Sequence, residues 1–253
     1  MLASALAVAV LMTVTALVAK ARSQVVVVDA AWGTGFAVVA LVCAVLGDAP
    51  VRWLLLAMVG VWGLRLARHT LTRLLASGEE DPRYAEMLDG KPFSVAVTRV
   101  FLTQGVAMWF VSLPVQVAAV TETRWWWVVA IGVVVWAVGL VFETVGDAQL
   151  KGYRAQPKES RPKVMDQGLW RYTRHPNYFG DACVWWGIWL VGLGGGLVGL
   201  ATVLSPAAMT YFLVFATGAK LLEKTMMQRE GYPEYAERTS MFVPLPPRKQ
   251  PVS

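Results

Sequence analysis

The segment from Gly168 to Asp181, GLWRYTRHPNYFGD, gathers side chains that can bind or transfer charged groups between two long apolar runs. Arginine offers planar donor pairs for phosphate, histidine and asparagine offer neutral hydrogen bonds, and a tyrosine ring offers a stacking surface. Polar side chains held at one edge of a membrane mark functional sites. The set suits a nucleotide cofactor, and its members are Arg171, Arg174, His175, Asn177, Tyr178 and Asp181.

Other polar residues lie at the ends of later apolar runs. Glu143 and Asp147 are four residues apart and therefore share one helix face, with Arg154 following them. A helix end solvated by its own ion pairs is the alternative interpretation. Glu223 ends the last apolar block, and Tyr235 lies on a short amphipathic segment behind it.

Three ionisable residues in the first third of the chain are candidates for the chemistry itself. Asp29 lies in an otherwise apolar stretch, where an unpaired carboxylate is costly, and a structural pairing with Arg65 or Arg68 competes with a catalytic role. The histidine side chain of His69 can donate a proton near neutral pH. The alternative interpretation is that His69 is a solvated residue at a helix end with no role in catalysis. Tyr84 belongs to GEEDPRY, a segment typical of a solvated turn.

The elements that position these residues are predicted to be membrane-spanning helices. Of the 253 residues, 56% are hydrophobic and only 16% charged, and Leu2–Ala19, Val100–Val120 and Trp125–Phe142 carry no charge at all. Each run has the length needed to cross roughly 30 Å of hydrocarbon as a helix. Val25–Leu46 and Val51–Leu64 add two expected spans.

The last uncharged block is too long for one crossing. Residues 182–219 would extend about 57 Å at the helical rise of 1.5 Å, so Gly194 to Gly196 are expected to divide the block into two spans. We therefore predict an all-α, polytopic membrane protein with about seven spans. We expect one transmembrane domain over residues 1–253, with a short disordered tail after Pro244.

The basic residues predict the orientation of the chain. Alternate connections contain 21 of the 23 lysine and arginine residues, and the other set contains only Arg52 and Arg124. Basic residues favour cytoplasmic loops, so the N-terminus should lie outside and the C-terminus in the cytoplasm. The net charge of +6 is then a topology signal and does not indicate nucleic acid.

Several motifs together resemble one family. They are DAAWG, EDPRY, the spacing of Glu143, Asp147 and Gln149, GLWRYTRHPNYFGD followed by WWG, and LLEK followed by GYPEYAERTS. Over nearly the whole chain this combination resembles bacterial steroid 5-alpha-reductase-like membrane proteins, formerly grouped as domain of unknown function 1295. The RHPNY core is also similar to isoprenylcysteine carboxyl methyltransferases and sterol C14 reductases, so this core alone indicates only the superfamily. The EDPRY and LLEK motifs narrow the resemblance to the one family.

The resemblance implies a reductase in a bacterial inner membrane, with NADPH entering from the cytoplasm and a lipid or steroid-like substrate entering from the bilayer. The implied cofactor site, within residues 125–245, contains Asp147, Arg154, Arg171, Arg174, His175, Asn177, Tyr178, Asp181, Glu223 and Tyr235. Asp181 departs from the glutamate that is more common there. Animal steroid reductases hold the enone carbonyl with a Gln-Glu pair and a tyrosine. This chain has neither the pair nor that tyrosine, and Asp29 and His69 occupy roughly matching places.

The expected reaction sets the roles of the candidates. Hydride addition to a conjugated double bond puts negative charge on the carbonyl oxygen, which needs a hydrogen-bond donor. The expected donor is Asp29 or His69, and Tyr84 or Tyr178 is the next candidate. A methyltransferase would use the RHPNY region for S-adenosylmethionine and need no such acid. A non-catalytic lipid-binding protein would need no nucleotide site.

Overall fold

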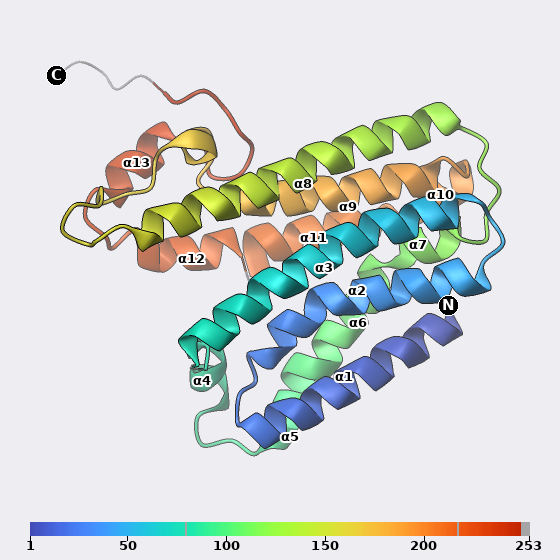
Figure 1. Ribbon diagram of the computed structural model, residues 1–253, viewed down its shortest axis with the longest axis horizontal. Coiled ribbons are helices and arrows are strands. Elements are labelled where there is room, and N and C mark those ends of the chain that lie inside the picture. Colours follow the sequence, from blue (N-terminus) through green and yellow to red (C-terminus); the bar gives the residue numbers. More distant parts are fainter. Residues whose placement is uncertain (79, 217, 249–253) are drawn as a thin grey trace. The chain divides into compact units, whose positions relative to one another are not determined.

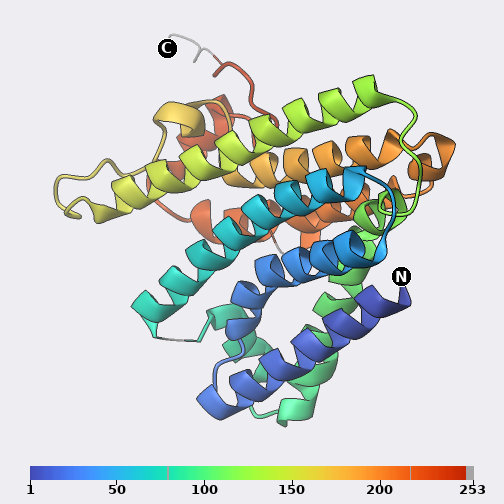
Figure 2. The same ribbon diagram turned by 45° about the vertical axis from the view of Figure 1, so that its right-hand side comes forward.

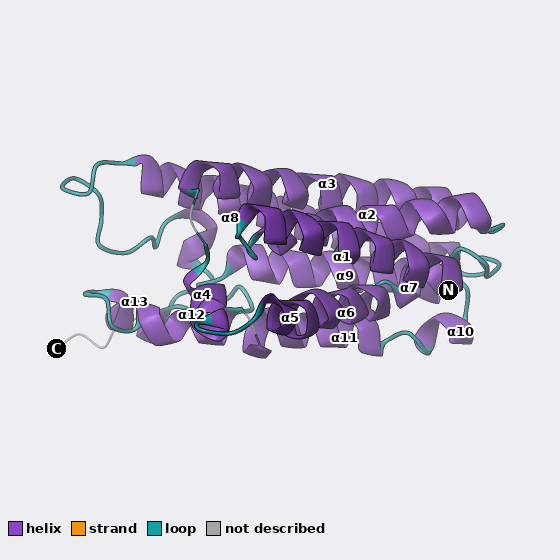
Figure 3. Cartoon of the chain, turned by 90° about the horizontal axis from the view of Figure 1, so that it is seen from below, coloured by secondary structure: helices purple, strands orange, loops and turns teal. Residues whose placement is uncertain are grey.

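The computed structural model describes residues 1–78, 80–216 and 218–248, and over these residues the protein is helical. Figure 3 shows the helices and loops, and the β-type pairing that the structure has in this part of the chain is an isolated bridge between Thr173 and Ser240. The predicted all-α class is confirmed. The chain divides into two compact units, residues 1–130 with 188–205 and residues 131–187 with 206–253, and each is described by itself.

The first unit is built on three long helices that are connected in sequence. Its elements are α1 (Leu2–Arg22), α2 (Val27–Leu46), α3 (Val51–Ser77), α4 (Pro82–Leu88), α5 (Phe93–Ala96), the π-helix η1 (Val97–Leu102), α6 (Thr103–Val111), α7 (Leu113–Ala118) and α10 (Leu197–Leu200). Helix α2 packs against both α1 and α3 (Figure 1). A Cβ atom on Gly33 of α2 would lie 2.3 Å from the Gly63 carbonyl oxygen of α3, so the two backbones touch where both residues lack a side chain.

The second unit contains most of α8 (Trp126–Ala155) and α9 (Pro176–Leu193), which also contribute residues to the first unit. Its other elements are the 3₁₀ helix η2 (Gly168–Arg171), α11 (Leu204–Tyr211, which begins in the first unit), the π-helix η3 (Phe212–Ala216), α12 (Ala219–Met226) and α13 (Tyr232–Arg238). These elements hold the segment that precedes α9 from several sides.

Glycines set the pairing of α8 with α9, which lie side by side in Figures 1 and 2. A Cβ on Gly139 would lie 2.5 Å from the Gly180 carbonyl oxygen, and one on Gly187 would lie 2.6 Å from the Gly132 carbonyl oxygen. At the other end Gly146 faces Pro176, so the helices run antiparallel. Small residues allow such close approach between membrane helices, and we did not predict this pairing from the sequence although the glycines recur there at regular spacing.

Within the described residues, six helical segments are long and apolar enough to cross a membrane, and the expected number of about seven is corrected. They are Leu2–Arg22, Val27–Leu46, Val51–Ala76, Phe93–Val111, Trp126–Ala155 and Leu197–Met226. The expected span that is absent from this set is α9, which opens with Asn177 and Asp181. Ala182, Val184 and Trp185 are buried in the protein, so α9 needs less apolar surface than a helix exposed to lipid.

Of two helix boundaries expected from the sequence, the structure confirms one and corrects the other. Helix α9 ends at Leu193 and α10 begins at Leu197, so the predicted break at Gly194 to Gly196 is confirmed. The expected span Val100–Val120 instead begins at Phe93 and ends at Val111, where the helix is interrupted before α7. Pro114, in the first turn of α7, lacks the N–H that an uninterrupted helix requires. The chain is a multi-pass helical membrane protein.

Candidate functional site

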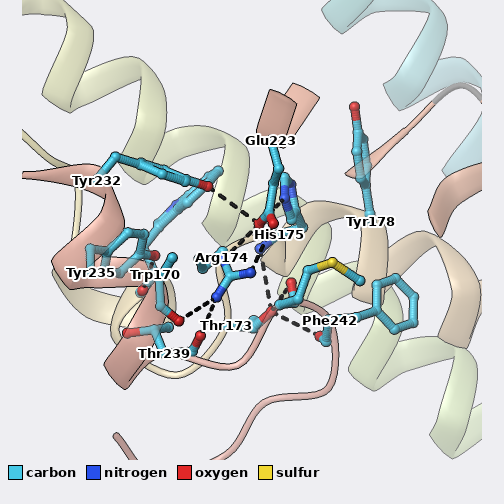
Figure 4. A network of polar contacts seen from close by, with 12 residues as sticks. Trp170, Thr173, Arg174, His175, Tyr178, Glu223, Tyr232, Tyr235, Thr239 and Phe242 are labelled. Carbon is cyan, nitrogen blue, oxygen red and sulfur yellow. Dashed lines mark hydrogen bonds and ion pairs between the residues drawn. The ribbon is translucent and has the colours of Figure 1, made fainter. Parts of the chain in front are cut away.

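Arg174 is the centre of a polar network in the second unit (Figure 4). Its Nε and one terminal nitrogen donate to the two carboxylate oxygens of Glu223 at 2.6 and 2.8 Å, and its other terminal nitrogen donates to the carbonyls of Ala236 and Thr239 at 2.7 and 2.6 Å. The side chains of Arg174 and Glu223 are only 10% and 14% exposed. Four of the five guanidinium donors are thus used within the protein. Arg174 joins the loop before α9 to α12 and α13.

Glu223 gathers further donors around the same carboxylate. The Nε2 atom of His175 lies 3.2 Å from its Oε1, and the hydroxyl of Tyr232 donates to Oε1 at 3.4 Å. The hydroxyl of Tyr235 donates to the carbonyl of Trp170. Burial raises the pKa of both phenols, so Tyr232 and Tyr235 remain protonated donors at neutral pH. These hydrogen bonds join the RHPNY segment and η2 to α12 and α13.

The remaining candidates lie on α8 and at the start of α9. The amide of Asn177 donates to Asp147 Oδ1 at 3.2 Å, and this contact joins the start of α9 to α8. The rings of Tyr178 and His175 are nearly parallel, at 5° with centroids 5.5 Å apart. Asp181 is buried one turn further along α9.

The two other arginines predicted for the cofactor site are exposed. Arg154 lies in the last turn of α8, and Arg171 lies at the end of η2. Arg171 also lines a cavity of about 450 Å³, whose lining is completed by Asp166, Gln167, Arg238, Thr239, Pro247 and Arg248. The charge of Arg171 therefore faces a space large enough for a ligand group.

The expectation of disorder after Pro244 is wrong as far as Arg248. The backbone N–H of Leu245 donates to the carbonyl of Tyr172 at 3.0 Å, and that of Arg248 donates to the carbonyl of Arg238 at 2.9 Å. Hydrogen bonds to the rest of the chain hold this segment although it has no helix or strand of its own. The remaining residues, 249–253, lie outside the described part of the chain.

In the first unit the structure brings Asp29 and Tyr84 together. The phenol hydroxyl donates to Asp29 Oδ1 at 2.9 Å and accepts a hydrogen bond from Gln104 Nε2 at 3.2 Å. Tyr84 is 8% exposed. Burial, and then the charge of Asp29, raise the pKa of Tyr84, so its hydroxyl stays protonated well above neutral pH. Asp29, Tyr84 and Gln104 form what we call the acid array.

Two cations lie near the carboxylate of the array. Arg83 and Arg73 place terminal nitrogens 3.7 and 3.9 Å from Asp29 Oδ2. Asp29 is in the first turn of α2. From there its carboxylate lies near Arg73 at the end of α3 and near Arg83 at the start of α4. His69 is half-buried on α3, one turn before Arg73. Two guanidinium groups therefore lie beside the Asp29 carboxylate.

The EDPRY motif fastens Tyr84 to the start of α2, so it is more than a solvated turn. The carboxylate of Glu80 accepts hydrogen bonds from the backbone N–H groups of Val25 and Val26, the latter at 2.9 Å. Asp81 caps α4 by accepting the N–H of Arg83 at 2.9 Å, and it also forms an ion pair with the guanidinium of Arg83. This hydrogen bonding lowers the pKa of Asp81. The preceding Glu79 lies outside the described residues.

Among the residues at these sites that were not predicted from the sequence are Gln104, Arg73, Arg238 and Arg248. Gln104 left a signal, since it is a polar residue within the uncharged run Val100–Val120. The arginines left none, because a basic residue at a helix end or in a tail is ordinarily solvated. The described residues contain no group of three or more histidine, cysteine, aspartate or glutamate side chains suited to a metal ion.

Comparison with known proteins identifies the family. No curated protein and no solved structure matches this sequence. The sequence model of one family, described as a protein of unknown function (DUF1295), matches residues 15–239 and so includes both the acid array and the network around Arg174. The chain therefore belongs to the DUF1295 family of proteins of unknown function.

Proposed function

We propose that this protein is an NADPH-dependent reductase of a bacterial inner membrane, and that it saturates a conjugated C=C bond in a lipid or steroid-like substrate. The observation that carries the proposal is the acid array, in which the buried phenol of Tyr84 is hydrogen-bonded to a carboxylate and to an amide. The motif resemblance supplies the reaction class.

The reaction needs a hydrogen-bond donor at the carbonyl oxygen of the substrate. A hydride adds to the carbon remote from the carbonyl, and negative charge moves to the oxygen. A proton, drawn ultimately from solution, then adds to the carbon next to the carbonyl. Bound NADPH would supply the hydride. A preorganised donor stabilises the charge on oxygen in a site that excludes water.

Tyr84 is the candidate donor in this scheme. Its raised pKa keeps the proton on the hydroxyl at neutral pH. The Tyr84 proton is donated to Asp29 Oδ1, so the hydroxyl would turn from Asp29 to the substrate oxygen when Tyr84 acts. Asp29, which lies beside two guanidinium groups, would hold the phenol until then. Gln104 fixes the oxygen from the other side. His69 remains the alternative donor on α3.

The residues of the second unit fit a dinucleotide by their chemistry. The exposed guanidinium groups of Arg154 and Arg171 suit phosphates, the ring of Tyr178 offers a stacking face, and the amide of Asn177 offers hydrogen bonds. Arg174, His175, Glu223 and Tyr235 would act by holding this surface in place. Asp147 and Asp181 supply acceptors beside it.

A binding experiment separates this function from its competitors. The purified protein in lipid nanodiscs is titrated with NADPH, NADH and S-adenosylmethionine, and NADPH should bind most tightly. Binding of S-adenosylmethionine without NADPH would assign a methyltransferase. Binding of neither would favour a non-catalytic lipid-binding protein.

The substrate is sought in the membrane lipids of a strain that lacks the protein. The product, heavier by two hydrogens than its precursor, should disappear. With that substrate, Tyr84→Phe should lower the turnover rate by about 10² to 10⁴ while NADPH affinity stays the same. Tyr211→Phe removes an exposed phenol and serves as the matched control. Wild-type turnover by Tyr84→Phe would exclude Tyr84 as the donor.

A further inference from the structure

The cavity lined by Arg171, Arg238 and Arg248, which we call the arginine cavity, carries more positive charge than the protein itself neutralises. Arg238 forms an ion pair with Asp166. Within the part of the chain that the structure describes, the side chains of Arg171 and Arg248 have no carboxylate partner. Two uncompensated guanidinium groups around a cavity of about 450 Å³ repel each other and attract an anion.

Three separate segments build the arginine cavity. Arg171 comes from η2, Arg238 ends α13, and Arg248 comes from the segment after it. The Arg248 N–H donates to the Arg238 carbonyl at 2.9 Å, which fixes the position of its backbone. The Arg174 side chain donates to the Thr239 carbonyl at 2.6 Å on the same wall. The arginines are therefore held together by the fold.

The chemistry of the lining indicates the kind of anion. Guanidinium groups form paired hydrogen bonds with the oxygens of phosphate, and several can share one phosphate monoester. Gln167 and Thr239 add neutral polar groups to the lining. The volume exceeds that of a phosphate ion, so the group that carries the phosphate can also enter.

We propose that the arginine cavity binds a phosphate monoester, and that residues 244–248 complete this site by bringing Arg248 to it. The phosphate can belong to the 2′ position of NADPH or to a lipid headgroup. In the first case the inference rests on the proposed function, and it adds Arg238 and Arg248 to the residues that bind NADPH. In the second case it stands alone.

The test measures binding of small phosphate monoesters to the full chain in neutral phosphatidylcholine nanodiscs. Adenosine 2′-monophosphate and inorganic phosphate are the soluble probes, and nanodiscs that contain phosphatidic acid present the headgroup. Arg248→Gln and Arg171→Gln should each weaken binding of the responsible probe by roughly tenfold or more. Arg229→Gln removes one exposed charge outside the cavity and should bind as the wild type does. Thermal unfolding of each variant checks that the fold is intact.

The outcomes distinguish the source of the phosphate. If Arg248→Gln no longer prefers NADPH to NADH, the phosphate that binds in the cavity is the 2′-phosphate of the dinucleotide. If Arg248→Gln loses only the binding of phosphatidic acid, the phosphate is that of a lipid headgroup. Binding of adenosine 2′-monophosphate without NADPH binding would retain the site and reject the reductase. Equal binding by wild type and Arg248→Gln, or no binding of any probe, would overturn the inference even if NADPH binds elsewhere.

Discussion

At the scale of single residues, two arginines three positions apart have different environments. Arg174 is almost buried and donates to Glu223 and to two backbone carbonyls, whereas Arg171 is exposed at the arginine cavity. Both arginines belong to the motif GLWRYTRHPNYFGD, and the motif alone does not distinguish their environments. The difference arises from α12 and α13, which are 49 to 65 residues away in the chain.

The first prediction contrasts these two arginines. Arg174→Ala leaves the largely buried Glu223 carboxylate without its cation, so it should lower the free energy of unfolding by about 3 to 5 kcal/mol. Arg171→Ala should change it by less than about 0.5 kcal/mol, as surface substitutions do. Denaturant unfolding in detergent micelles measures both. Equal losses in the two variants would contradict the assignment of a structural role to Arg174.

The second prediction concerns alkaline pH and Tyr84. The folded-state pKa of Tyr84 lies above the unfolded value of about 10, so its contribution to stability is complete below pH of about 10 and is lost as pH rises. Tyr84→Phe removes that contribution. Its unfolding free energy should therefore fall less steeply than that of the wild type above about pH 10. Parallel curves for the two proteins would show that the environment of Tyr84 does not shift its pKa.

Sequence reasoning found most members of the candidate site but not their partners. Asp29 and Tyr84 were both candidates, yet their hydrogen bond joins residues 55 positions apart and depends on EDPRY being fastened to α2. Arg174 was predicted as a cofactor ligand from its residue type and motif, and its ion pair with Glu223 was not predicted because the two residues are 49 positions apart. Residue type and local spacing identify chemistry, whereas tertiary contacts decide which group performs it.

At the scale of elements, α8 and α9 meet along a line of glycines. Gly139 and Gly180 let the two backbones touch, and a side chain at either position would meet main-chain atoms that cannot move aside alone. The uncharged runs predicted most of the spans correctly because composition decides whether a helix can lie in lipid. They did not predict that α9 is less apolar, since that depends on which neighbours cover it.

The third prediction uses a glycine control on the same helix. A Cβ on Gly139 would lie 2.5 Å from a carbonyl oxygen and 2.6 Å from a backbone nitrogen, whereas one on Gly152 would have nothing within 4 Å. Gly139→Ala should therefore destabilise the protein by about 1 to 3 kcal/mol. Gly152→Ala should be neutral or stabilise by up to about 1 kcal/mol. Unfolding curves that rank the variants in the reverse order would reject the close contact of α8 and α9.

At the scale of the whole molecule, charge predicts how the chain is oriented in the membrane. The split of 21 basic residues against 2 was derived with seven spans, and the structure provides six segments that meet the criteria of length and apolarity. Helix α9 nevertheless runs antiparallel to α8 from Gly146 to Gly132 and so returns the chain to the level where α8 began. The charge-based orientation stays a prediction, and it requires that α9 cross the membrane in addition to the two candidate spans that follow Arg124.

The fourth prediction is the topology itself. A reporter fused after Ser253 should be cytoplasmic, and one inserted between Thr121 and Arg124 should be external, because basic loops remain on the cytoplasmic side. Cysteine labelling of intact cells at the same positions is an independent measurement. A cytoplasmic signal from the insertion would place an even number of crossings between the two points and reject the orientation.

The long sequence separations in the network around Arg174 also have a consequence for the time course of biosynthesis. Arg174 leaves the ribosome 65 residues before Thr239, its most distant partner, which is about 3 to 13 s at ordinary elongation rates. During that interval the nascent chain already holds α8 and can insert α9, while the guanidinium still lacks its carboxylate and its carbonyls. A pause in translation before residue 223 would prolong this state, in which α8 and α9 exist but the candidate cofactor surface does not.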